Sequence, residues 1–344
     1  MLELLRTDMA EWDRLVDEHP QATVFHRRVW LELVSRISGA QLHPFSIVRG
    51  TERVGLFPVF VFRRGPFRIA ASPPAQAATP YLSPLVDDVL LGDTLEAFAR
   101  TATALRASYL ELRFDRQVAD SVLAAAHLQH DTRATFLLDL RPGPEALWRD
   151  RLTSACRRAI RKAQSSGVVV EETQLAEIVD RYHELAEGVF AKSNRPAPLT
   201  RADYAAIADV VQRGGPIKVF VARLDGALVS AGIFPYAAGA VYYLDGVSDP
   251  AGQQARSNNL LHWEVIRWAC AAGLQRYDMV GAGISGVARF KQGFGPVEAP
   301  YTYAFRSLTP LARLARGIYA LLAPAARAAQ YALSRSGRSG PRGD

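Results

Sequence analysis

The sequence is poor in cysteine and contains no long apolar run. Its 344 residues include only two cysteines, Cys156 and Cys270, which are far apart and lack CxxC spacing. Sparse thiols exclude a disulfide scaffold and a cysteine-based zinc site, and they are typical of a reducing compartment. No apolar stretch approaches the roughly 20 residues that span a bilayer, and Met1 is followed by acidic residues instead of a signal peptide. We therefore expect a cytoplasmic protein without a transmembrane helix.

Acidic residues are absent from residues 299–343. That segment holds seven arginines, so that with Asp344 it contributes +6 of the formal net charge of +7. Because the rest of the chain is nearly neutral, the basic pI does not predict DNA binding. Apolar residues recur at helical spacing after Pro310, beside several of these arginines. The pattern predicts a basic amphipathic helix and disordered tail at 307–344, which lies on an anionic leaflet at the inner face of the plasma membrane or docks on the protein itself.

Two segments far apart in the chain share one pattern. Residues 45–62 and 218–237 each read as an apolar strand, a polar turn with glycine, and a second strand that ends in Gly-apolar-Phe-Pro. A helical stretch and a short strand follow each copy. This repeat predicts an α/β fold of two similar domains, each a mixed sheet flanked by helices. We place the N-terminal domain at residues 1–140, the C-terminal domain at 141–306 and the tail at 307–344.

A basic helix is predicted at the start of the second domain. Apolar residues recur at helical spacing from Trp148 to Gly167, after two prolines that prevent an earlier start. The opposite face carries Arg157 and Arg161, one turn apart, among further cations, and residues 151–170 include no carboxylate. A solvated face is one interpretation of such a run, and a phosphate-binding patch is the other.

Glycines crowd the segment GAGISGVARFKQGFG at 281–295. Its first six residues fit GxGxxG, but a dinucleotide site needs a helix of several turns after the glycines, and Gly293 ends any helix here after a turn or two. Upstream, Ser257 or Asn258 is predicted to cap a helix that includes Asn259. The N-terminus of that helix is either an anion site or a plain helix start.

Three motifs in fixed order resemble one family. They are LWRDRLTSACRRAIRKAQSSGVVVEE at 147–172, SNNLLHWEVIRWACAAGLQRYDMVGAG at 257–283 and GVARFKQGFGP at 286–296. The chain resembles the FemABX aminoacyltransferases and the related FemAB-like acyltransferases of the GNAT superfamily. The resemblance implies tandem GNAT-like domains and transfer of an acyl or aminoacyl group to an amine of a peptidoglycan, polysaccharide or other envelope precursor, free or lipid-linked.

The same resemblance implies the co-substrates. The donor is acyl-CoA, an acyl-carrier protein or aminoacyl-tRNA, and neither a permanently bound cofactor nor a metal is expected. The chain departs from the tRNA-dependent members that carry a long coiled-coil arm, because it has no charged heptad segment. A degenerate transferase that only binds an anionic envelope precursor is the alternative function.

The resemblance also implies site residues. Lys291, in the FKQGFG motif, corresponds to a family lysine near the reacting centre and is expected to stabilise developing negative charge. Asp245 and Asp278, at predicted strand ends, are equal candidates for the general base. The residues predicted to contact substrate are Arg157, Arg161, Tyr243, Ser257, Asn258, Asn259, Arg289, Phe290, Phe294 and Gly295.

Overall fold

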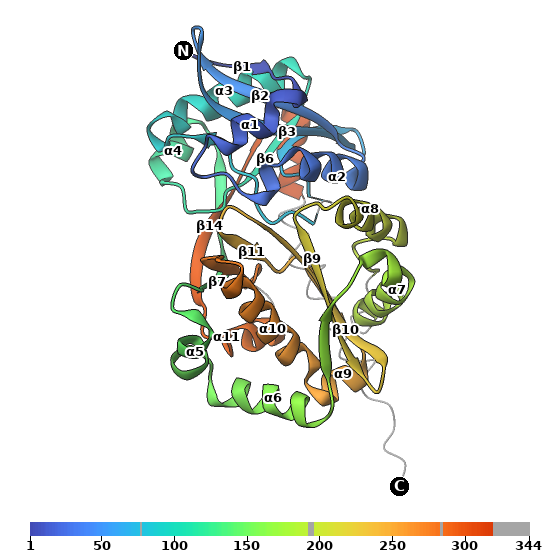
Figure 1. Ribbon diagram of the computed structural model, residues 1–344. Helices are drawn as coiled ribbons and strands as arrows, with labels where there is room; N and C mark the ends of the chain where they lie inside the picture. Colours follow the sequence, from blue (N-terminus) through green and yellow to red (C-terminus); the bar gives the residue numbers. More distant parts are fainter. Residues whose placement is uncertain (76–77, 192–195, 283–284, 319–344) are drawn as a thin grey trace.

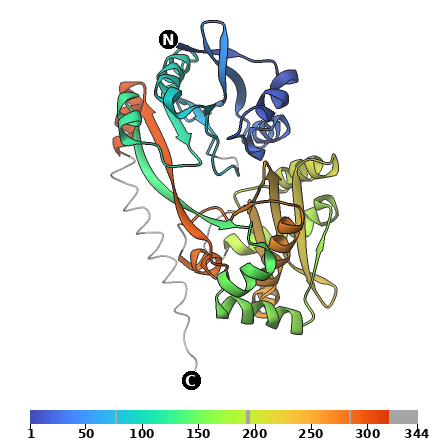
Figure 2. The same ribbon diagram turned by 60° about the vertical axis from the view of Figure 1, so that its left-hand side comes forward.

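The computed structural model describes residues 1–75, 78–191, 196–282 and 285–318. Their strands form one mixed sheet in the order β1-β2-β3-β4-β6-β14-β7-β13-β11-β10-β9-β8, with β5 beside β3 and β12 beside β10. Figures 1 and 2 show two lobes joined by the long strands β7 and β14. Within the described residues, no helix is both long enough and apolar enough to cross a membrane.

The N-terminal lobe carries helices on both faces of its part of the sheet. Its strands are β1 (Leu2–Arg6), β2 (Gln41–Arg49), β3 (Glu52–Arg64), β4 (Phe67–Ser72), β5 (Leu85–Val86) and β6 (Tyr109–Arg113). Its helices are α1 (Met9–Asp17), α2 (Arg28–Ser38), α3 (Leu91–Ala104) and α4 (Asp120–Ala125), with the short turns η1 (Val24–His26) and η2 (Asp88–Leu90). Apolar side chains of α3 and α4 pack on one face, and those of α1 and α2 pack on the other.

The C-terminal lobe repeats this arrangement. Its strands are β7 (Gln129–Asp139), β8 (Val169–Glu172), β9 (Ile217–Leu224), β10 (Ala227–Ala237), β11 (Ala240–Tyr242), β12 (Asp245–Ser248), β13 (Arg276–Asp278) and β14 (Val297–Ser307). Its helices are α5 (Gly143–Ala146), η3 (Leu147–Arg151), α6 (Ser154–Ser165), α7 (Leu175–Ala191), α8 (Arg201–Gln212), α9 (Pro250–Ala255), α10 (Ser257–Ala271) and α11 (Ser285–Gln292). α6 and α10 cover one face, and α7 and α8 cover the other.

The internal repeat is confirmed by the pairing of the strands. β2 with β3 and β9 with β10 are antiparallel hairpins, as the two matching sequence segments predict. In each lobe a helix then leads into a parallel pair, β4 with β6 in the first and β11 with β13 in the second. A helical crossover between parallel strands is the connection that this pairing requires.

The two lobes exchange strands. β14, from the end of the chain, pairs with β6 of the N-terminal lobe on one side and with β7 on the other. β7 in turn pairs with β13 of the C-terminal lobe. The boundary proposed at residue 140 remains a prediction, but hydrogen bonds of the sheet cross between the two predicted domains.

The predicted basic helix is shorter than its sequence pattern suggests. The short helix η3 ends before Leu152, whose ψ is 130°. Thr153 then caps a new helix, α6, by accepting a hydrogen bond from Cys156 N at 3.2 Å. The break is held from outside, because Thr153 N donates to the carbonyl oxygen of Gly293 at 2.9 Å. The prediction of one continuous helix from Trp148 was therefore wrong, because the helix breaks between η3 and α6.

Only the beginning of the predicted tail helix can be described. Residues 310–318 are helical, and the remainder of the predicted tail lies outside the described residues. Ala312 is buried, whereas the side chains of Leu311, Leu314 and Ile318 are exposed.

Candidate active site

The sheet of the C-terminal lobe opens where two parallel strands separate. β11 runs beside β13 from Ala240 to Tyr242, but β12, the continuation of the same stretch of chain, pairs only with β10. At the point of separation, Tyr243 N donates to the carbonyl oxygen of Asp278 at 2.9 Å. Side chains at the C-terminal end of β13 therefore face a gap between strands, a common place for ligands in sheets with parallel strands.

Lys291 of α11 reaches into this opening. Its side chain is buried, with 5% exposed, and its ammonium donates to the carbonyl oxygens of Val280 and, at 3.0 Å, Gly281. The ammonium also lies 5.5 Å from the ring centre of Tyr243. Burial lowers the pKa of Lys291 to about 8, and the nearby Asp278 partly opposes that shift. A lysine with such a pKa changes charge close to neutral pH.

Asp278 is buried beside Lys291 and has partners from both halves of the chain. Its carboxylate accepts hydrogen bonds from the hydroxyls of Thr135 at 2.6 Å and Tyr81 at 2.8 Å, and from Val280 N at 2.9 Å. Burial raises the pKa of Asp278, and these hydrogen bonds oppose the rise because they favour the carboxylate. Both lobes thus build the surroundings of this group.

Asp245, the second predicted base, lies in a different environment. The hydroxyls of Tyr204 and Tyr182, on α8 and α7, donate to one oxygen of its carboxylate at 2.8 Å and 3.2 Å. Burial raises the pKa of Asp245 as well, against these two hydrogen bonds. Among the described groups, Asp278 is the carboxylate whose charge bears on the pKa of Lys291. The structure therefore distinguishes two residues that the sequence left equivalent.

An aromatic cluster that includes a buried histidine closes the site behind Lys291. His262 has 1% of its surface exposed, and its Nδ1 lies 2.7 Å from the Tyr277 hydroxyl. Its ring packs against Tyr243, Phe290 and Phe294 at centroid distances of 4.5, 5.2 and 5.6 Å. Burial, followed by the charge of Lys291, lowers the pKa of His262 to about 3, so the ring is neutral. The sequence analysis missed this residue, whose only signal is a histidine among apolar residues of LLHW.

A cationic cleft of about 770 Å³ adjoins α11, the helix that carries Lys291. Arg158 and Lys162 of α6, Arg256 before α10, and Arg289 of α11 line it. Its lining within the described residues includes no carboxylate. Of the residues predicted to contact substrate, Asn259, in the first turn of α10, and Phe290 line the cleft together with Arg289. Four cations beside a helix N-terminus are an arrangement suited to phosphate groups.

Arg157 and Arg161, the two arginines of α6 predicted to contact substrate, do not line the cleft. The Arg157 guanidinium donates to the carbonyl oxygens of Leu152 at 2.6 Å and Trp148 at 2.9 Å, and the Arg161 guanidinium lies 5.6 Å from the Trp148 ring centre. Arg157 therefore secures the break before α6. Their neighbours Arg158 and Lys162 line the cleft instead, because the break at Leu152 sets which face of α6 meets it.

The start of α10 also differs from the prediction. Arg256, with φ of 64°, is the N-cap, so the prediction of a Ser257 or Asn258 cap was wrong. Ser257 is fully buried, and its hydroxyl bonds to Ser230 and to the Gly252 carbonyl oxygen. Its side chain therefore faces the protein interior. Asn258 is not among the residues that line the cleft.

The last motif residues pack the turn against the rest of the domain. Phe294 is fully buried. Gly295 has φ of 75°, and a Cβ on it would lie 2.4 Å from the carbonyl oxygen of Arg151. Only glycine permits this approach. The FKQGFG motif thus places Lys291 in the site. The turn that follows Lys291 packs against the helix break before α6.

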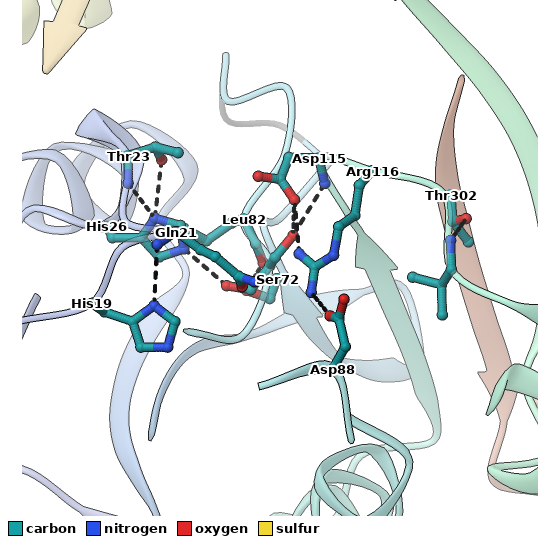
Figure 3. Close-up of polar contacts among 12 residues, drawn as sticks. His19, Gln21, Thr23, His26, Ser72, Leu82, Asp88, Asp115, Arg116 and Thr302 are labelled. Atoms are coloured by element: carbon teal, nitrogen blue, oxygen red, sulfur yellow. Dashed lines mark hydrogen bonds and ion pairs between the residues drawn. The ribbon is translucent and has the colours of Figure 1, made fainter. Parts of the chain in front are cut away.

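A polar network occupies the corresponding end of β6 in the N-terminal lobe (Figure 3). The His26 Nε2 lies 2.9 Å from the Ser83 carbonyl oxygen, and the Ser83 hydroxyl donates to Asp115 at 2.8 Å. Arg116 then joins Asp115 at 3.2 Å and Asp88 at 2.6 Å. Burial lowers the pKa of His26 to about 4. The network ties together loops that are distant in the sequence.

Comparison with known proteins identifies the C-terminal lobe. Residues 150–292 match the family model described as an acetyltransferase (GNAT) domain. The match spans most of the C-terminal lobe and does not extend to the N-terminal lobe. The matched residues contain the sheet opening, Lys291 and, apart from Gly293, the residues that line the cationic cleft. The sequence has no significant match among curated proteins.

Solved structures show the same fold over most of the chain. FemX superposes with a TM-score of 0.71 at 15% identity, over 87% of this chain and 96% of FemX. The C-terminal domain of a putative lysylphosphatidylglycerol synthetase from Agrobacterium fabrum gives 0.59 at 15% identity, over 92% and 98% of the two chains. A tandem GNAT protein from the clavulanic acid biosynthesis pathway gives 0.54 at 14% identity, over 90% and 99%. The predicted tandem, FemAB-like GNAT fold is confirmed.

Proposed function

We propose that the protein transfers an acyl group from acyl-CoA or a related phosphate-bearing donor to an amine of a cell-envelope or polysaccharide precursor. One observation carries the proposal: α11 places Lys291 in the opening of the sheet while Arg289, two residues earlier, lines the cationic cleft. A single short helix thus connects a site for phosphate with a buried cation at the gap between strands.

The cleft supports the choice of donor. Arg158, Lys162, Arg256 and Arg289 supply charge for a pyrophosphate, and the positive end of the α10 helix dipole adds to it. Acyl-carrier protein, through its phosphopantetheine, and aminoacyl-tRNA present phosphates as well. Each of these donors would supply an acyl carbonyl already activated by a good leaving group.

The chemistry is a direct attack on that carbonyl. The neutral acceptor amine forms the new C–N bond, and the bond from the carbonyl carbon to the leaving sulfur or oxygen breaks, its electron pair departing with that atom. The nitrogen loses one proton to the base, and the leaving thiolate or alkoxide takes up a proton and is released as thiol or hydroxyl. We assign proton acceptance to Asp278, whose pKa burial has raised, and stabilisation of developing negative charge to the protonated form of Lys291. The aromatic cluster around His262 keeps water from the site and so strengthens the electrostatic interaction.

The identity of one structural neighbour suggests how the acceptor is presented. A lysylphosphatidylglycerol synthetase is named for placing an aminoacyl group on a lipid headgroup, so a lipid-linked acceptor at a membrane surface is consistent with the shared fold. The exposed side chains of Leu311, Leu314 and Ile318 lie three or four residues apart in the helical segment 310–318, in an arginine-rich region. We infer that this segment contacts an anionic bilayer.

A kinetic assay tests the proposal. The full chain is incubated with amine acceptors and with acyl-CoA, acyl-carrier protein or aminoacyl-tRNA, and product formation is measured. Arg158→Ala and Lys162→Ala should each raise the KM for the donor about tenfold, equivalent to ~1.4 kcal/mol, with little change in kcat. Arg149→Ala is the matched control, because Arg149 is exposed and paired with Asp150 outside the cleft. Binding of donors without turnover of any would favour the alternative, a non-catalytic binding module.

A further inference from the structure

A second cavity, of about 720 Å³, lies where the N-terminal lobe meets the strands β7 and β14. Its walls come from the turn between β3 and β4, from strands β6, β7 and β14, and from the helical residues 310–318. Its volume falls within the range of small-molecule sites in proteins. The proposed mechanism uses none of the residues that line this cavity.

Charged groups of both signs face the cavity. Arg64, Arg133, Glu111 and Asp131 line it, and none of the four forms an ion pair within the part of the chain that the structure describes. The Arg133 guanidinium lies 4.0 Å from the ring centre of Tyr303. Stacking of this kind orients a guanidinium and leaves its N–H groups available for a carboxylate or a phosphate.

The cavity also has an aromatic wall with a buried polar atom. The Tyr303 hydroxyl donates to Glu111 at 2.9 Å, which fixes that carboxylate in place. The hydroxyl of Tyr109 is buried and makes no hydrogen bond within the described residues. Because buried polar atoms are nearly always hydrogen-bonded, this hydroxyl indicates a partner outside the described residues.

The cavity and Asp278 lie on the same face of the β7–β14 ribbon. Asp131, Arg133 and Thr135 alternate along β7, so their side chains point to one side of the sheet. Thr135 donates to Asp278, and Arg133 pairs across the strands with Tyr301. Arg133 is two residues from Thr135, a distance of roughly 7 Å along a strand. The cavity thus begins about one such step from the hydrogen-bond partners of Asp278.

Aromatic side chains follow the same path. The Tyr301 ring lies 5.0 Å from the ring of Tyr81, and the Tyr81 hydroxyl donates to Asp278. Tyr303, two residues further along β14, stands against Arg133 in the cavity. A molecule lying along this face would therefore contact the protein along its whole length, from Arg133 to the carboxylate of Asp278.

We propose that this cavity binds the acceptor, as an amine-bearing anion whose carboxylate or phosphate pairs with Arg133 and Arg64 and whose amine extends along the ribbon toward Asp278. The inference rests on the proposed function and defines its second substrate. The separation of Arg133 from Thr135 requires an acceptor whose amine and anion are on the order of 7 Å apart or more. Free α-amino acids that react through their α-amine are too short.

Binding of simple probes tests the inference directly. Isothermal titration calorimetry on the full chain compares 6-aminohexanoate, 6-aminohexyl phosphate and hexylamine, which share a chain length and differ in the anion. We expect hexylamine to bind at least tenfold more weakly than the preferred anion, and the two anionic probes to separate a carboxylate from a phosphate site. Arg133→Gln should weaken binding of the preferred probe at least tenfold. Arg63→Gln, which removes the same charge from an exposed neighbour outside the cavity, should leave it unchanged.

The outcomes separate this inference from the proposed function. Equal binding by wild type and Arg133→Gln, or acyl transfer whose acceptor KM does not change in Arg133→Gln, would overturn the acceptor site and leave the acyltransferase proposal intact. Binding that depends on Arg133, with no turnover from any donor, would instead overturn the proposed transfer and support an anion site of other use. Arg64→Gln provides the same comparison if Arg133→Gln does not fold.

Discussion

The carboxylate of Asp278 accepts a hydrogen bond at 2.6 Å from the hydroxyl of Thr135, a residue 143 positions earlier in the chain. Thr135 lies on β7, which pairs with β13 and carries Asp278's partner from the first half of the sequence into the C-terminal lobe. Strand β7 therefore brings to the proposed base a hydrogen-bond donor that opposes the rise of its pKa on burial. Hydrogen bonds to a carboxylate favour its charged form.

Thr135→Val and Tyr81→Phe each remove one of these donors. Because both changes destabilise the carboxylate, the pKa of Asp278 should rise further above its usual value, and the acidic limb of the kcat profile should move to higher pH. The measurement is kcat as a function of pH for each variant. Thr94→Val is the control, since Thr94 is equally buried but donates to Leu90 in α3. An acidic limb at the wild-type position in both variants would exclude Asp278 as the base.

Lys291 should produce the alkaline limb. Its pKa of about 8 means that the protonated form, which we assign to charge stabilisation, is lost as the pH rises through that value. We expect kcat to fall above about pH 8 in the wild type, and a Lys291→Arg variant that retains activity to lack this limb, because arginine stays charged. Steady-state assays between pH 6 and 10 make the comparison.

Lys291→Ala should reduce kcat at least 100-fold, a loss of about 2.7 kcal/mol of transition-state stabilisation. The melting temperature should change by only a few degrees, because the two lost hydrogen bonds are offset by removal of a buried charge. A stable variant with full activity would remove Lys291 from the mechanism.

Acidification should destabilise the fold through two histidines. His26 and His262 have folded-state pKa values of about 4 and about 3, against 6.5 for an unperturbed histidine. The unfolded chain therefore binds protons first as the pH falls below about 6.5, and stability present above that pH is lost, by about 2 kcal/mol per histidine at pH 5. The raised pKa values of Asp245 and Asp278 act in the opposite direction.

His26→Gln isolates one of these contributions. Its free energy of unfolding, measured by denaturant titration at pH 7 and pH 5, should fall less on acidification than that of the wild type. Gln retains a side-chain donor for the Ser83 carbonyl oxygen, which His26 contacts at 2.9 Å. An unchanged pH dependence would show that His26 is not neutral in the folded protein or is not buried.

Membrane contact should depend on three exposed side chains. Replacing Leu311, Leu314 and Ile318 by serine should weaken cosedimentation with vesicles containing anionic lipid by about tenfold or more, because their apolar area no longer enters the bilayer. Vesicles of neutral lipid and a Val89→Ser variant, altered at an exposed apolar residue of the N-terminal lobe, are the controls. Substitution is preferable to deletion from residue 307, since Leu308 packs against the core of that lobe. Equal sedimentation of the triple variant would refute the membrane contact.

The general architecture could be predicted because its signals are local or periodic. The matching hairpins at 45–62 and 218–237 required only comparison of the chain with itself, and the structure pairs both as expected. The motif FKQGFG indicated Lys291, which the structure buries at the opening of the sheet. The sequence indicated Arg157 and Arg161, whereas Arg158 and Lys162 line the cleft. Which side of α6 faces the cleft depends on a helix break held by Gly293, which is distant in the sequence.

The sequence by itself determined that this chain forms two related α/β units and that the second carries motifs resembling those of FemAB-like acyltransferases, since hydrophobic periodicity and motif order are properties of the chain. Only the tertiary structure decided which carboxylate lies beside Lys291 and which cations meet in one cleft. Those relationships depend on the pairing of β7, β13 and β14, and pairing between strands far apart in the chain leaves no local signal in the sequence. Burial, which sets the pKa values of Lys291 and Asp278, exists only once that sheet has formed.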